Sequence, residues 1–218
     1  MRIFICTVFV CFFTYGCVQP QDNPQDVNKL PMYGHVKRTA AQLAADTKFI
    51  AIYESLGRSR KAVAAHLVVR GWEYMDAKQL DSSMINFNQA WLIDSLNADI
   101  YWGFGDILGM QGKFKGSIPF FNRSLQINPA NAKVWNDEST SYGNTFLQTK
   151  EKKYLDSTIF CLKKAVNFDP QIAQLYSQLS ASYSYITQKD SARKYLRITE
   201  QLDPSAVNPD VKKMLENK

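Results

Sequence analysis

The stretch that decides the fold is ADIYWGFGDILGMQGKFKGSIPFFNRSLQINPAN, residues 98–131. Apolar residues recur at helical spacing in both halves, and a glycine-containing turn separates the halves. Asn128-Pro129 ends the second half, because proline cannot continue a helix and pushes the preceding residue out of the α region. The stretch therefore predicts two short helices joined by a turn.

Similar helix ends recur at a regular interval along the chain. Asp169-Pro170 and Asp203-Pro204 each end an apolar run, and the interval between their prolines is a period of about 34 residues. The interval from Pro129 to Pro170 is longer than this period by seven. One period before Pro129 lies Ile93–Asn97, a similar helix end without a proline. Such a period, built from helix–turn–helix units, indicates a solenoid.

Large and small residues also keep one register through the repeats, with Ala98 as a first position. The fourth position holds Leu67, Tyr101, Trp135 and Tyr176, and the eighth holds Gly71, Gly105, Ser139 and Ser180. The twenty-fourth position holds Phe87, Phe121, Leu162 and Leu196. The small residue at the eighth position lets the two helices of a unit approach closely.

On these positions the chain resembles the tetratricopeptide repeat family over about residues 64–206. The resemblance implies an all-α, right-handed superhelical solenoid of four repeats, at 64–97, 98–131, 132–172 and 173–206. An apolar stripe predicts an N-terminal capping helix within 37–63, and residues 207–218 are expected to form a C-terminal capping helix.

Two details of the repeats yield local expectations. Asp81, Asp156 and Asp190 are expected to open the second helices and to accept first-turn backbone hydrogen bonds. The third repeat carries seven extra residues between Tyr142 and Leu155. They lengthen either both helices, or one helix and the turn. They form either a tolerated surface insertion or a partner contact beside the groove.

The amino terminus has the pattern of an export signal. Met1-Arg2 precede an apolar run at 3–15, and Gly16-Cys17 follows, which resembles a bacterial lipoprotein signal. Residues 1–16 are thus expected to be a signal peptide, Cys17 to carry lipid and 17–36 to form a flexible tether. Ordinary secretion or an uncleaved anchor are the alternatives. Anchoring to the outer membrane of a bacterium, on its periplasmic or surface face, is the expected location.

Composition and motifs exclude several functions. The net charge of +6 is spread along the chain without a basic aromatic face, so nucleic acid is not an expected partner. His35 and His66 stand far apart, so no metal site is expected, and no cofactor-binding motif occurs. Asp99 and Asp106 share a helix face, but exposed acids at this spacing are common, so no catalytic residue is assigned. After the leader only Cys161 remains as a thiol, expected to be a semi-buried apolar residue.

The family resemblance implies a concave groove lined by the first helix of each repeat, at positions two, five, nine, twelve and thirteen. Carried over, these are Val68, Trp72, Met75, Asp76, Asp99, Trp102, Asp106, Met110, Lys133, Asn136, Thr140, Asn144, Gln174, Ser177 and Tyr185. Trp72 and Trp102 stand out, because the repeat does not require an aromatic residue there. They either face the groove or are covered as core by the capping helix.

A groove with two tryptophans, methionines and acids suits an extended or helical peptide with apolar anchors and a lysine or arginine. The sequence thus predicts a non-catalytic, membrane-anchored protein–protein interaction scaffold of the bacterial cell envelope. One alternative is a structural or assembly subunit of an envelope or secretion complex. Another is a carbohydrate- or nutrient-binding lipoprotein with Trp72 and Trp102 as stacking platforms. The oligomeric state stays open.

Overall fold

The computed structural model describes residues 27–55 and 57–216, and every regular element within these residues is helical. The signal peptide at 1–16 and Cys17 lie outside the described residues. The elements are η1 (Pro31–His35), α2 (Ala40–Ser55), α3 (Arg60–Asp76), α4 (Leu80–Ile93), α5 (Ala98–Met110), α6 (Phe114–Ile127), α7 (Ala132–Thr149), α8 (Lys152–Phe168), α9 (Ala173–Tyr185), α10 (Lys189–Leu202), η2 (Pro204–Ala206) and α11 (Pro209–Glu216).

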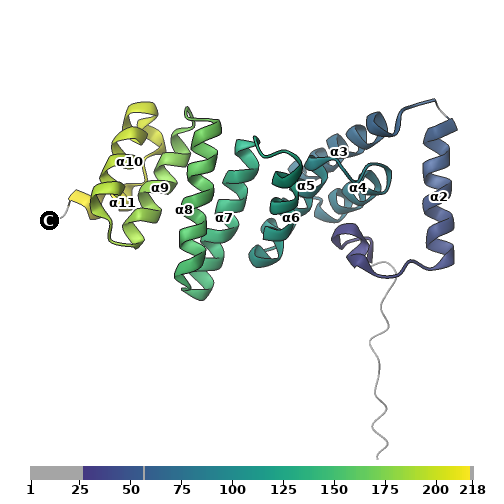
Figure 1. Cartoon of the computed structure of the whole chain (residues 1–218), viewed down its shortest axis with the longest axis horizontal. Helices are drawn as coiled ribbons and strands as arrows, with labels where there is room; N and C mark the ends of the chain where they lie inside the picture. The colour runs from purple at the N-terminus through teal and green to yellow at the C-terminus, as the bar shows by residue number, and fades with distance from the viewer. Residues whose placement is uncertain (1–26, 56, 217–218) are drawn as a thin grey trace, which may run out of the picture.

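The helices pack as four consecutive pairs, α3–α4, α5–α6, α7–α8 and α9–α10. Each pair also packs against the next, so the pairs stand in one row (Figure 1). The first helices α3 and α5, and α5 and α7, contact each other directly. The expected all-α solenoid of tetratricopeptide-type helix pairs is thereby confirmed.

The fourth position of the repeat has the same role in three successive pairs. The Tyr101 hydroxyl donates to the carbonyl of Ser95 at 2.8 Å, and the Trp135 indole N–H to that of Pro129 at 2.9 Å. The Tyr176 hydroxyl donates to the carbonyl of Pro170 at 3.0 Å. Each side chain thus reaches the carbonyl six residues back, which ties the start of a first helix to the end of the preceding second helix.

In the first two pairs, the close approach of the two helices depends on a glycine at the eighth position. A Cβ atom on Gly71 would lie 2.8 Å from the Phe87 ring, and one on Gly105 would lie 2.6 Å from the Phe121 ring. A Cβ atom on Gly103 would also clash with the Phe87 ring. Phe87 therefore fills the space between two repeats, and it is fully buried. This is the packing that the alternation of large and small residues predicts.

The extra residues of the third repeat lengthen both of its helices. The helices α7 and α8 have 18 and 17 residues, whereas α5 and α6 have 13 and 14. The turn between α7 and α8 stays short because Lys150 takes a left-handed conformation, with φ 59°. Of the two arrangements that the sequence allowed, the structure has the first.

The helix starts differ from the expectation at the three aspartates. Asp81 and Asp190 lie in the first turns of α4 and α10, but no side-chain cap hydrogen bond forms at either start. The prediction is wrong for Asp156, because α8 begins at Lys152 and places this residue one turn inside the helix. Side-chain caps form instead at the starts of the first helices α5 and α7: Asn97 accepts from the N–H of Asp99, and Asn131 accepts from those of Lys133 and Val134.

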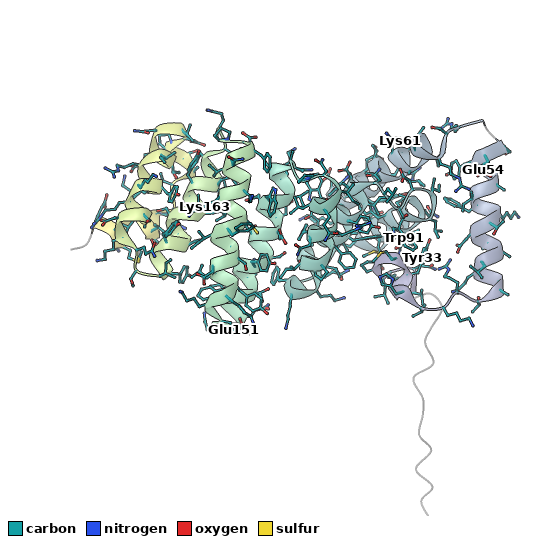
Figure 2. The ribbon with its side chains drawn as sticks, viewed as in Figure 1. Tyr33, Glu54, Lys61, Trp91, Glu151 and Lys163 are labelled. Atoms are coloured by element: carbon teal, nitrogen blue, oxygen red, sulfur yellow. The ribbon has the colours of Figure 1, made fainter. Side chains whose placement is uncertain are left out.

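At the N-terminal end, part of the segment assigned to a tether packs against the solenoid. The side-chain amide of Asn88 on α4 donates to the carbonyls of Asn28 and Leu30, at 2.9 Å each. Tyr33 is buried in η1 beside α4, with the guanidinium of Arg38 over its ring at 3.9 Å (Figure 2). The helix α2 buries no residue completely, although Phe49, Ile50 and Tyr53 pack on the core. The solenoid end is therefore covered by η1 as well as by α2.

At the other end, α11 closes the solenoid as a short helix. Leu215 is buried in a hydrophobic cluster that also contains residues of α9 and α10, and Val207 and Val211 pack against this cluster. Lys212 forms an ion pair with Glu200 at 2.7 Å. None of the described helices has both the length and the apolar content that crossing a bilayer requires.

The buried core is divided into three clusters along the row. A large cluster runs from Val63 to Ile107, and a second runs from Ile159 to Leu215. Between them lies a small cluster of Phe121, Leu125 and Val134, with Trp102 and Trp135 packed against it. The smallest of the three clusters thus lies where α6 of the second pair packs on α7 of the third pair.

Candidate functional site

Three cavities lie in sequence along the first helices. A cavity of about 340 Å³ lies between α5 and α7, one of about 300 Å³ between α7 and α9, and one of about 410 Å³ between α9 and α11. Thr140 lines the first and the second, while Ala181 and Tyr185 line the second and the third. The three cavities therefore adjoin one another in a row, which is named the trough below.

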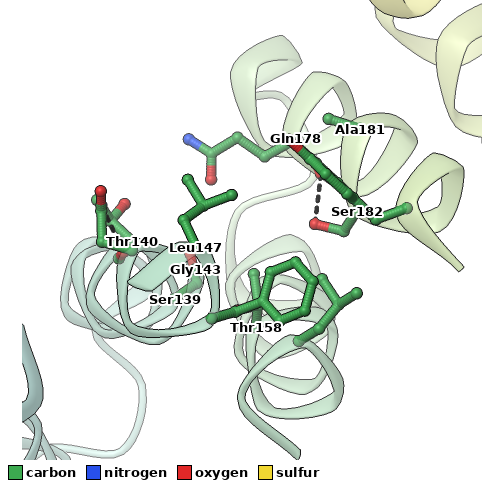
Figure 3. A pocket seen from close by; sticks show the side chains of 12 residues that line it. Ser139, Thr140, Gly143, Leu147, Thr158, Gln178, Ala181 and Ser182 are labelled. Atoms are coloured by element: carbon green, nitrogen blue, oxygen red, sulfur yellow. Dashed lines mark hydrogen bonds between the residues drawn. The ribbon is translucent and has the colours of Figure 1, made fainter. Parts of the chain in front are cut away.

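The middle cavity has both apolar and polar lining residues. Its lining includes Phe146, Leu147, Leu155 and Tyr185, with Ser139, Thr140, Gln178 and Ser182 (Figure 3). Leu147 is 46% exposed and Tyr185 is 62% exposed. The Tyr185 ring meets the Phe146 ring edge-on, with 5.7 Å between centroids. Such a cavity suits an apolar or aromatic side chain of a ligand.

Two carboxyl groups border the cavity between α5 and α7. Asp106 comes from α5 and Asp137 from α7. Burial, and then the charge of Asp137, raise the pKa of Asp106 to about 8. Burial also raises the pKa of Asp137, while hydrogen bonds from Trp102 and Asn136 and the charge of Lys133 lower it. The Trp102 indole N–H donates to Asp137 Oδ2 at 2.8 Å.

The charge of these two carboxyl groups is not balanced by a direct ion pair. No ion pair among the described residues includes Asp106 or Asp137. Lys133, whose charge acts on Asp137, is exposed. The side-chain nitrogen of Asn136 contacts Asp137 Oδ1 at 3.5 Å, and its oxygen is buried with no hydrogen-bond partner among the described residues. The site therefore has spare acceptor capacity.

The two tryptophans pack mainly on each other and on the core. The Trp72 and Trp102 rings lie 4.7 Å apart between centroids, tilted by 59°. Trp72 also meets Phe87 edge-on at 5.3 Å, and it packs against the N-terminal cluster. Both residues are only partly exposed. Trp72 is thus largely a core residue, whereas Trp102 links the core to the carboxyl pair.

The positions carried over from the family divide into three groups. Five line the trough: Asp106, Met110, Thr140, Asn144 and Tyr185. Three are buried in the helix packing and do not face a ligand: Val68, Met75 and Ser177. The rest lie outside the residues that line the three cavities, although Trp102 and Asn136 contact Asp137: Trp72, Asp76, Asp99, Trp102, Lys133, Asn136 and Gln174.

Reasoning from repeat positions missed Asp137 and three apolar residues that line the middle cavity, Phe146, Leu147 and Leu155. Asp137 is a sixth position, three residues before Thr140, and so lies one turn earlier on the same helix face. A helix-face argument would have found it. The pairing of carboxyls also differs from the one considered from sequence: Asp137, not Asp99, acts on Asp106, and the raised pKa of Asp99 has burial alone as its cause.

A further carboxyl group is buried behind the trough. Glu138 is 1% exposed, and the thiol of Cys161 on α8 donates to its Oε2 at 3.5 Å. Burial raises the pKa of Glu138 to about 7, and the hydrogen bond from Cys161 lowers it. Burial also raises the pKa of the Cys161 thiol, so this thiol is poorly reactive. Among the described residues no group of three His, Cys, Asp or Glu side chains is placed to hold a metal ion.

The comparisons with known proteins concern the repeat and the fold. The tetratricopeptide repeat family model matches residues 98–131, and no curated protein sequence matches the chain. The fold resembles a crystal structure of MamA, with 16% identity, a TM-score of 0.58, and coverage of 78% of this chain and 98% of that one.

Two further structures resemble the fold to a similar degree. For PilF of Pseudomonas aeruginosa the identity is 17%, the TM-score 0.59 and the coverage 71% of this chain and 66% of that one. For a thermophilic TPR protein of Thermus thermophilus these values are 17%, 0.55, 70% and 79%. The family model thus matches one repeat of the chain, and the three structures share its solenoid fold of helix pairs.

Proposed function

We propose that this chain is a non-catalytic interaction scaffold that binds a segment of another protein, or a peptide, along the trough. The observation that carries the proposal is the row of three adjoining cavities over α5, α7, α9 and α11. An elongated ligand fits such a shape better than a compact one, because successive side chains can enter successive cavities.

The exposed apolar side chains of the trough support the same proposal. Met110 and Met214 are 50% and 46% exposed, and Leu147 and Tyr185 are exposed between them. Covering this surface would contribute about 25 cal/mol per Å² of apolar area, before the costs of ordering the ligand. Exposed apolar groups that follow one groove are typical of a binding surface.

The location is a proposal from the sequence resemblance. The chain is exported, and a lipid on Cys17 anchors it to the outer membrane of a bacterium. The ten residues from Cys17 to Val27 reach at most about 35 Å when extended, so the anchor holds the solenoid near the lipid surface. Labelled fatty acid should be incorporated by the native chain and lost in the Cys17→Ser variant; retained label would contradict lipidation.

The trough geometry favours protein binding over the two rival functions. A sugar-stacking platform needs a free ring face, but Trp72 and Trp102 pack on each other and Trp72 also packs on Phe87. A fixed assembly subunit would be held by its second helices, which present the exposed Phe160 on α8. These two surfaces can be tested separately.

The test places a photo-crosslinking amino acid in the native cell at one of two positions. Substitution of Tyr185 by p-benzoylphenylalanine probes the trough, and the same substitution of Phe160 is the matched control on an exposed aromatic of α8. A discrete crosslinked protein from the Tyr185 position alone supports binding in the trough. Crosslinks from the Phe160 position alone would instead favour an assembly subunit.

A further inference from the structure

We propose that the partner segment inserts a lysine or arginine side chain into the cavity between α5 and α7, where Asp106 and Asp137 receive its charge. This inference rests on the proposed function and names the chemistry of the partner. The neighbouring cavity between α7 and α9 receives an apolar side chain of the same segment. The recognised sequence therefore combines a basic residue with a nearby apolar or aromatic residue.

The first argument is charge. Two carboxyl groups from adjacent first helices border one cavity, and neither has an ion-pair partner among the described residues. Among the described residues, the cationic group that acts on Asp137 is Lys133, which is exposed, and none is found to act on Asp106. A cation placed between the two carboxyls favours their charged form, so its binding releases the proton that Asp106 holds at neutral pH and strengthens as the pH rises.

The second argument is unused hydrogen-bonding capacity. The Trp102 indole already occupies Oδ2 of Asp137, which holds this carboxyl in place. Asn136 contacts Asp137 but lies outside the cavity lining, and its buried oxygen has no donor among the described residues. An ammonium or guanidinium group carries several N–H donors and no acceptor, so it can donate to the remaining oxygens of the two carboxyls.

The third argument is the volume and the lining of the cavity. Besides the carboxyls, the cavity of about 340 Å³ is lined by Met110, Phe114 and Phe121. The methylene stem of lysine or arginine packs on such apolar walls while its charged end reaches the acids. A metal ion is a poorer occupant, because the described residues contain no group of three suitable ligands.

The fourth argument is the connection to the next cavity. Thr140 lines both cavities, so an extended segment that fills one passes directly into the other. The second cavity offers Phe146, Leu147, Leu155 and Tyr185 and no charged group among its lining residues. The change from acidic to apolar lining along the trough sets the order of side chains that the ligand must present.

The experiment selects ligands from a displayed library of random peptides on the full-length protein. The same selection uses the isosteric double variant Asp106→Asn/Asp137→Asn, and Asp76→Asn at the exposed end of α3 is the matched control. We expect wild type and control to enrich peptides with a basic residue beside an apolar one. The double variant should keep the apolar preference and lose the basic one. Circular dichroism verifies the fold of each variant.

A second measurement tests the pairing on single peptides. The basic residue of an enriched, fluorescein-labelled peptide is replaced by norleucine, and affinities are read by fluorescence anisotropy. We expect the norleucine peptide to bind wild type about tenfold or more weakly, as for a lost hydrogen bond to a charged group. With the double variant the two peptides should bind with nearly equal affinity.

The possible outcomes separate this inference from the function on which it rests. Enriched peptides without a basic preference, or a norleucine peptide that binds as tightly as its parent, would overturn the inference and leave peptide binding intact. If no peptide is enriched on any form of the protein, peptide binding in the trough fails and the inference fails with it.

Discussion

Replacing Glu138 by glutamine should make the protein more stable near neutral pH. Glu138 is buried between α7 and α8 without a cation, and burial raises its pKa from 4.5 to about 7. The folded state therefore holds a proton that the unfolded state releases between these two pH values. The free energy of unfolding of the native protein must then fall as the pH rises through this window.

The size of the effect follows from the pKa difference. A shift from 4.5 to about 7 corresponds to about 3 kcal/mol of stability, fully present below pH 4.5 and lost by slightly above pH 7. The Glu138→Gln variant has a similar shape, can still accept from the Cys161 thiol, and cannot ionise. The stability of the variant relative to the native protein should therefore rise by about 3 kcal/mol across the window.

Urea unfolding followed by far-UV circular dichroism at several pH values measures this difference. Asp106 and Asp137 also titrate abnormally, but both are present in the two proteins, so their contributions cancel in the comparison. The exposed Glu73→Gln on α3 is the control and should show no such trend. A stability difference between Glu138→Gln and the native protein that stays constant from pH 4.5 to 8 would refute the reasoning.

Three further changes test the packing. Gly103→Ala should lower the free energy of unfolding by about 1–3 kcal/mol, because the added methyl group would clash with the Phe87 ring. Gly116→Ala on α6 is the control and should be neutral or stabilising, because the space around Gly116 is open. Thermal unfolding compares the two variants. Asn131→Ala should cost about 1 kcal/mol through the lost cap of α7, seen as a lower urea midpoint, and an unchanged midpoint would contradict the cap. Cys161 should react with iodoacetamide only after unfolding, as mass spectrometry can show; rapid alkylation of the folded protein would contradict its burial.

The repeat register could be predicted from the sequence because it depends on local spacing. Tyr101, Trp135 and Tyr176 occupy one repeat position, and this shared position predicted a shared role. Each of them donates a hydrogen bond to the backbone carbonyl six residues earlier in the chain. The small residue opposite Phe87 or Phe121 is likewise a property of one helix pair. Patterns of this kind repeat along the chain and are therefore visible without coordinates.

The carboxyl pair could not be predicted in the same way. Asp106 and Asp137 meet because of how α5 and α7 are rotated against each other, and they occupy different positions of the repeat. The packing of the segment around η1 depends on Asn88, whose side chain donates to two backbone carbonyls far away in the sequence. A single contact of this kind does not recur in the repeats, so no periodic pattern predicts it. The inserted residues predicted either that both α7 and α8 are longer or that one helix and the turn are longer, and the sequence did not decide between these two arrangements.

The division of the core has a mechanical consequence for the trough. The small cluster at Phe121, Leu125 and Val134 lies between two larger clusters, at the contact of α6 with α7, which is the most extensive contact between successive helix pairs. Asp106 and Asp137 stand on opposite sides of this contact, on α5 and α7. The two walls of the acidic cavity should therefore move together, and the amide hydrogens of α6 and α7 should exchange slowly already in the free protein.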